Sequence, residues 1–71
     1  PNPAKDVINV ELAERCENVS WTLVNVNGQV VKKSYEQYDS FVIKLDEINS
    51  GLYFLNLDID GKQMMRKIVV E

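Results

Sequence analysis

The residues of this chain that could do chemistry are acidic side chains and one thiol, because histidine is absent. Asp58, Asp60 and Gly61 resemble the centre of a calcium-binding loop, where oxygen ligands at alternate positions precede a glycine. If Asp60 and Gly61 held the fifth and sixth loop positions, the glutamate required at the twelfth would fall on Lys67. A cation there repels calcium. Asp60 and Gly61 therefore predict a hairpin turn, not a metal site.

The other reactive groups lack the partners that catalysis needs. Cys16 is the only cysteine, and no histidine can activate its thiol, although Arg15 is its neighbour in the sequence. We expect Cys16 to be a passive side chain in or near a loop, with a reactive thiol as the alternative. Asp46 and Glu47 are adjacent, so their carboxylates point in different directions and indicate solvated surface. We predict that the chain is not an enzyme and needs no metal or other cofactor.

The length and net charge of the chain limit the class of protein and the kinds of binding partner that it can have. The 71 residues, 45% hydrophobic and 27% charged, predict one globular domain over residues 1–71. A net charge of −3 lacks the basic excess that nucleic-acid binding requires. No apolar run approaches the roughly 18 to 20 residues that cross a bilayer. Because the sequence starts at Pro1 without a leader, we expect a domain excised from a larger secreted protein.

Alternating apolar residues predict β-strands, each with one buried face. The inward positions are Ile8, Val10 and Leu12 in 7–12, Val19, Trp21 and Leu23 in 19–26, Ile43 and Leu45 in 41–45, and Tyr53, Leu55 and Leu57 in 52–59. In the last strand, 62–70, either Met64, Ile68 and Val70 or Met65 and Val69 face inward, and a bulge near Arg66 would reconcile the two patterns. Helix is an alternative only at 6–15, or as one turn at 46–49.

Glycines mark the turns between these strands. Asn27 and Gly28 predict a type I′ hairpin with positive φ at both residues, and Asp60 and Gly61 predict a second hairpin. Gly51 is expected to have a positive φ, because the chain must turn sharply into a strand there. Six or seven short strands with regular turns predict an all-β fold, a small antiparallel immunoglobulin-like β-sandwich. Its predicted core is Ile8, Val10, Trp21, Leu23, Leu45, Tyr53, Leu55 and Leu57.

Four short motifs, in this order along the chain, resemble one family. They are Pro1-Asn2-Pro3 followed by Asp6, Asn25-Val26-Asn27-Gly28-Gln29-Val30-Val31, Gly51-Leu52-Tyr53-Phe54-Leu55, and Lys67-Ile68-Val69-Val70. Together they resemble the C-terminal sorting domain of the type IX secretion system, type A. The resemblance covers essentially all 71 residues.

The resemblance implies an address label with no chemistry of its own. Members are carried from the periplasm through the outer membrane of Bacteroidetes by machinery that recognises the folded domain. This implies a cargo domain N-terminal to Pro1 and a secreted or cell-surface location. A sortase-like cysteine protease usually then cuts ahead of the domain and attaches the cargo to lipopolysaccharide. The alternative is a fibronectin-like or Ig-like spacer or interaction module of an extracellular protein, which would have much the same fold.

The C-terminal strand is the expected contact with the secretion machinery. We predict recognition through Arg66, Lys67, Ile68, Val69 and Val70, with Arg66, Lys67 and Lys62 forming a positive stripe that steers the domain towards an acidic receptor. The alternative is that Lys67 is only an exposed strand cation. A dimer formed by strand exchange is also left open.

Overall fold

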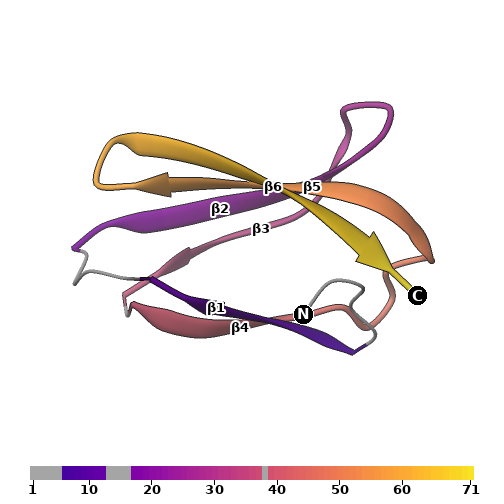
Figure 1. Ribbon diagram of the computed structural model, residues 1–71, viewed down its shortest axis with the longest axis horizontal. Helices are drawn as coiled ribbons and strands as arrows, with labels where there is room; N and C mark the ends of the chain where they lie inside the picture. The colour runs from indigo at the N-terminus through magenta and orange to yellow at the C-terminus, as the bar shows by residue number, and fades with distance from the viewer. Residues whose placement is uncertain (1–5, 13–16, 38) are drawn as a thin grey trace.

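The chain folds into two packed antiparallel sheets, which confirms the predicted immunoglobulin-like sandwich (Figure 1). A computed structural model describes residues 6–12, 17–37 and 39–71. These residues form six strands, β1 (Val7–Glu11), β2 (Val19–Asn25), β3 (Val30–Glu36), β4 (Ser40–Lys44), β5 (Gly51–Ile59) and β6 (Lys62–Val70). The described part of the chain has no helix, and hence none that could span a membrane.

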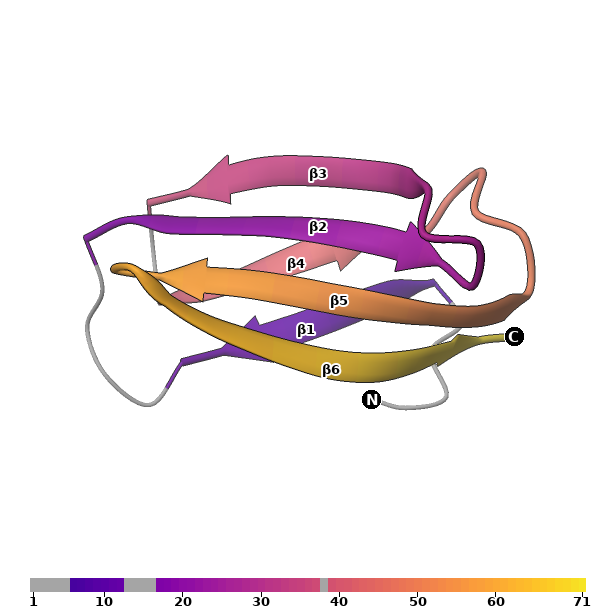
Figure 2. The same cartoon turned by 90° about the horizontal axis from the view of Figure 1, so that it is seen from above.

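The sheets differ in width. One contains β1 and β4, and the other has the order β3-β2-β5-β6. Figure 2 shows β4 and β1 crossing beneath the middle and the β6 side of the wider sheet. Residues 62–67 of β6 are exposed, although β6 is among the longest strands. The narrow sheet therefore covers β2 and β5 well and leaves much of β6 open.

The core forms as the alternation predicts. All eight predicted core residues are buried, and Val19, Phe41, Ile43, Ile68 and Val70 join them. Leu23 of β2 and Ile43 of β4 are the most deeply buried, at 0% and 1% exposure. The indole N–H of Trp21 donates a hydrogen bond to Glu36 Oε2 at 3.0 Å, so the polar atom of this bulky side chain is satisfied.

The hairpin between β2 and β3 is not the predicted type I′ turn. Gly28 has a φ of 82°, but Asn27 is not among the residues with positive φ. The Asn25 side-chain oxygen accepts hydrogen bonds from the backbone N–H groups of Asn27 and Gln29, both at 3.0 Å. Asn25 and Gln29 also pair through the backbone, which leaves a three-residue loop with a glycine at its end. The Asn25 side chain thus stabilises a longer loop than the Asn27-Gly28 dipeptide predicts.

The second predicted hairpin is confirmed. Asp60 and Gly61 have φ values of 51° and 89°, and Ile59 pairs directly with Lys62. Positive φ at both residues of a two-residue loop is the type I′ geometry. From this turn β5 and β6 pair without a register shift as far as Gly51 and Val70, so the predicted bulge near Arg66 is wrong.

The one irregularity in the wide sheet lies between β2 and β3. Leu23 pairs with Lys32, but Val24 pairs with Val30, so Val31 is the extra residue. Arg66 needs no bulge, because it faces inward where the narrow sheet does not cover β6 and its side chain remains exposed. The sequence places a cation on a core-facing strand position, and the fold leaves that position open.

Tyr53 and Gly51 shape the entry into β5. Gly51 has a φ of 152°, which confirms the predicted positive φ. The Tyr53 hydroxyl donates a hydrogen bond to the Asn49 carbonyl oxygen at 2.7 Å, and Tyr53 is buried. A tyrosine that bonds the backbone a few residues upstream is a feature of immunoglobulin-type sandwiches. The turn at 46–49 is not helical, and Glu47 has a φ of 69°.

Truncation of Tyr53 tests the core and its hydrogen bond separately. Tyr53→Ala should lower the free energy of unfolding by about 3 kcal/mol or more, because a buried ring is lost. Tyr53→Phe should cost about 1 kcal/mol, because only the bond to the Asn49 carbonyl is lost. Urea denaturation measures both values. A Tyr53→Ala protein as stable as the parent would contradict the assigned core.

Substitution at Gly51 tests the backbone conformation. A Cβ there would meet only Tyr53 Cε1 at 3.8 Å, so space is not limiting. Gly51→Val should nevertheless cost about one to three kcal/mol, because a β-branched residue is strained at this φ. Thermal denaturation measures the loss, and Leu52→Val at the neighbouring exposed position is the control for a valine where φ is not positive. Equal stability of the two variants would show that the backbone at Gly51 does not require a glycine.

Candidate functional site

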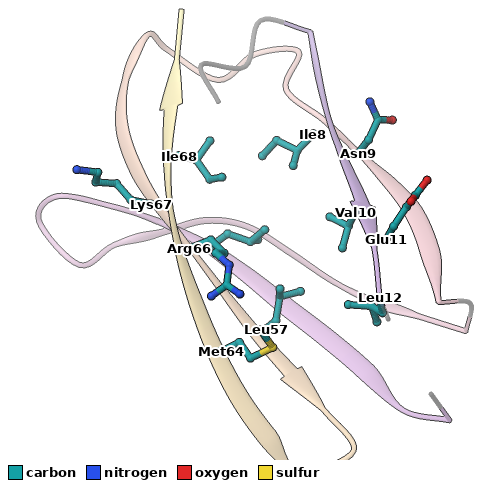
Figure 3. A pocket seen from close by; sticks show the side chains of 11 residues that line it. Ile8, Asn9, Val10, Glu11, Leu12, Leu57, Met64, Arg66, Lys67 and Ile68 are labelled. Atoms are coloured by element: carbon teal, nitrogen blue, oxygen red, sulfur yellow. The ribbon is translucent and has the colours of Figure 1, made fainter. Parts of the chain in front are cut away.

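The strand predicted to carry recognition, β6, is an edge strand. It pairs with β5 on one side and with no other strand in the described residues. Ile68 and Val70 are buried at 6% and 3% exposure, whereas Lys67 is exposed and Val69 is 40% exposed. Figure 3 shows Lys67 pointing away from the side of β6 that carries Ile68. The predicted recognition set therefore lies on two faces: Lys67 and Val69 are exposed on the outward face, Arg66 is exposed at an uncovered inward position, and Ile68 and Val70 are buried.

The cations of β6 do not form one stripe. Arg66 and Lys62 occupy inward positions, opposite Leu55 and Ile59, and Lys67 occupies an outward position opposite Phe54. Arg66 Nη1 donates a hydrogen bond to the carbonyl oxygen of Met65 at 3.0 Å. The positive charge at this edge is thus divided between the two faces of the sheet.

A groove opens between β1 and the inner side of β6 (Figure 3). Its volume is about 340 Å³. Its walls are mainly apolar and come from β1, β5 and β6, with Ile8, Val10, Leu55, Leu57, Met64 and Ile68 among them. Ile8 and Ile68 point towards each other across it, and Glu11 and Arg66 also line it. The groove therefore combines apolar side chains with three charged residues, Glu11, Arg66 and Lys67.

The carboxylates considered for calcium have structural partners. Asp58 Oδ1 accepts a hydrogen bond from the backbone N–H of Gly61 at 3.0 Å. Asp60 Oδ1 accepts bonds from the backbone N–H groups of Asn18 at 2.8 Å and Glu17 at 3.2 Å. Asp60 therefore ties the β5–β6 hairpin to the segment that enters β2, a contact the sequence did not reveal. No cluster of potential metal ligands occurs in the part of the chain that the structure describes.

The described parts of the four motifs lie at one end of the molecule. Asn25 pairs with Tyr53, and Tyr53 pairs with Ile68, so three motifs are adjacent on neighbouring strands. Gly51 pairs with Val70 in the same region, and Gly28 is in the hairpin that follows β2. Figure 2 shows that β1 begins and β6 ends at this end. Motifs far apart in sequence thus form one corner of the sandwich.

The first motif is only partly described. Asp6 is exposed, and its carbonyl oxygen accepts a hydrogen bond from the backbone N–H of Leu45 at 2.9 Å. This bond lies beside the pairing of Val7 with Lys44 and extends the contact between β1 and β4. Pro1, Asn2, Pro3 and Cys16 lie outside the described residues.

Comparison with known protein families shows which family the chain resembles over its whole length. The model of a family described as "Secretion system C-terminal sorting domain" matches residues 1–71. No curated protein matches the chain. The match covers the whole sequence, including all four motifs, whose described residues lie together at one corner.

Substitution of Asp60 tests its role in this arrangement. Asp60→Ala should lower the free energy of unfolding by about 1–3 kcal/mol, because it loses the bond to Asn18 and places alanine at positive φ. Asn27→Ala is the matched control, since Asn27 is exposed and its φ is not positive. It should change stability by no more than about 0.5 kcal/mol. Urea denaturation measures both changes in stability. Equal losses in the Asp60→Ala and Asn27→Ala variants would contradict the structural role assigned to Asp60.

Proposed function

The chain belongs to the family of secretion system C-terminal sorting domains, and from this premise we propose that it docks as a folded domain on the type IX export machinery through β6. A domain of this family is a non-catalytic sorting signal that directs its protein to the cell surface or the medium. The observation that carries the docking proposal is the position of β6, an edge strand with Lys67 exposed on its outward face.

Two properties of β6 support a contact there. β6 is the last strand of its sheet among the described residues, and a partner can reach the exposed side chains of Lys67 and Val69 on its outward face. Lys67 adds a positive charge to a chain whose net charge is −3, and such a local charge steers association with an acidic surface. Ile68 and Val70 contribute indirectly, because their burial fixes the register that turns Lys67 outward.

We propose that the later steps are those that are usual in this family. A sortase-like cysteine protease at the cell surface cuts ahead of the domain and attaches the cargo to anionic lipopolysaccharide. The first strand of the described fold begins at Val7, so a cut before it would leave the six described strands uncut. In this scheme the domain is recognised, separated from its cargo and released as one folded unit.

Transfer of the domain to a reporter tests this function. The reporter carries a periplasmic export signal and is expressed in a host with the type IX system. The fusion should reach the cell surface or the medium, and removal of residues 67–71 should leave it in the periplasm. That truncation also removes the buried side chains of Ile68 and Val70, so Lys67→Glu is the cleaner variant.

Lys67→Glu should reduce delivery while stability changes by no more than about 0.5 kcal/mol, as is usual for an exposed position. Lys44→Glu is the matched control, because Lys44 is an exposed strand lysine on the other sheet. Fractionation and thermal denaturation measure the two properties. Normal delivery of both the Lys67→Glu and the truncated fusions would refute docking through β6. Periplasmic retention of the intact fusion would favour a structural spacer.

A further inference from the structure

The outer face of the wide sheet carries apolar side chains that neither sheet covers. They alternate with the core residues along β2, β5 and β6. Leu52, Val69 and Met65 are 37%, 40% and 59% exposed, and Val30 on the neighbouring β3 is 54% exposed. Exposed apolar residues are common singly, but a contiguous group of them indicates an interaction surface. The strand register decides whether these residues are contiguous.

The register places them in adjacent rows. One row crosses the sheet through Val30, Val24, Phe54 and Lys67, each paired with the next. The row on one side contains Leu52 paired with Val69, and the row on the other runs from Lys33 through Thr22 and Asn56 to Met65. We call the apolar members Val24, Val30, Leu52, Phe54, Met65 and Val69 the outer patch.

Two lysines stand at opposite margins of the outer patch. Lys33 lies on β3 and Lys67 on β6, the two edge strands of the sheet. The three rows contain no carboxylate, and the acids nearest to them along the strands are Asp58, opposite Ser20, and Glu71, two residues after Val69. The chain has 11 acidic and 8 basic residues. At the two edge strands the outer patch is therefore flanked by charge of the opposite sign to that of the whole domain.

We propose that the outer patch, with Lys33 and Lys67, is the surface on which an apolar, acid-rimmed face of an export-machinery protein docks. This rests on the proposed function and extends it to Lys33, which lies on the opposite edge strand from β6 and outside the four motifs. Apolar contact supplies the adhesion, and the two lysines set the orientation by pairing with the acidic rim.

The charges favour a protein partner over the other occupants. Attraction to an anionic membrane surface contributes about 1 kcal/mol of binding free energy for each nearby lysine. Two lysines on a chain of net charge −3 therefore give only weak binding. A second copy docked by the same face would bring its own lysines towards Lys33 and Lys67, which is unfavourable. Docking on a different protein with an acidic rim avoids both the weak attraction to a membrane and the repulsion between like charges.

The size of the surface indicates a transient contact. Four strands about 4.8 Å apart and three rows about 7 Å apart span an area on the order of 400 Å². A standard stable complex buries about 800 Å² on each partner. A contact of this size alone gives a short-lived complex, as a signal that must be released after transport requires.

The test is the reporter fusion with Lys33 changed instead of Lys67. Lys33→Glu should lower surface delivery about fivefold or more, because it sets a carboxylate against the acidic rim. Lys44→Glu on the other sheet should deliver normally. Val69→Thr and Val42→Thr form a second matched pair, since Val42 is 52% exposed on the outward side of β4. Only Val69→Thr should reduce delivery. Thermal denaturation of each purified domain should show equal stability within a pair.

The outcomes separate this proposal from the proposed function. Failure of the unchanged fusion to leave the periplasm overturns the sorting role itself. Normal delivery of the unchanged, Lys33→Glu and Val69→Thr fusions overturns only the outer patch. Sedimentation with vesicles containing anionic lipid, weakened by Lys33→Glu, would assign the patch to a membrane and overturn a protein partner. Sedimentation velocity could also show a dimer that Lys33→Glu dissociates. That result would assign the outer patch to a second copy of the chain and would overturn a protein partner from the export machinery.

Discussion

Burial of the inner face of β2 and β5 against the narrow sheet fixes the direction of the side chains in the wide sheet. Leu23 and Leu55, paired with each other, are 0% and 2% exposed, and Ile43 of the opposite layer is 1% exposed. A shift of one residue in this pairing would turn apolar residues out and polar residues in. Because the β5–β6 ladder continues without interruption, the same constraint turns Ile68 inward and Lys67 outward. The accessible surface of the domain thus depends on a few buried leucines.

The alternation of apolar residues correctly predicted the features that depend only on residues close together in the sequence. The core residues of β1, β2, β4 and β5 are buried as expected, because apolar residues at every second position leave a strand one way to bury them. Asp60, Gly61 and Gly51 have the expected φ values, since steric limits act within one residue. Asn27 does not, because the Asn25 side chain bonds the loop from outside the dipeptide. The conformation of a turn depends on its flanking side chains as well as on its central pair.

The site was less accessible to sequence reasoning because it is not local. The motif Lys67-Ile68-Val69-Val70 reads as one unit in the sequence, but a strand divides consecutive residues between two faces. The exposure of Arg66 could not be read from its neighbours, because it depends on how much of β6 the narrow sheet covers. Lys33 and Lys67 belong to one surface only through three successive strand pairings. No pattern along the chain carries that information before the strand order is known.

Lysines at sheet edges can also serve to prevent aggregation. A change in the sign of their charge distinguishes this role from docking. Edge strands commonly carry charged residues that prevent pairing with other chains, and Lys33 and Lys67 are on the two edges of an exposed apolar face. Protection of this kind depends on the presence of a charge and works with either sign, because desolvating a carboxylate is as unfavourable as desolvating an ammonium group. Docking on an acidic rim depends on the sign itself. A carboxylate in place of either lysine preserves the protection and removes the attraction, so a loss of delivery without aggregation can come only from the contact.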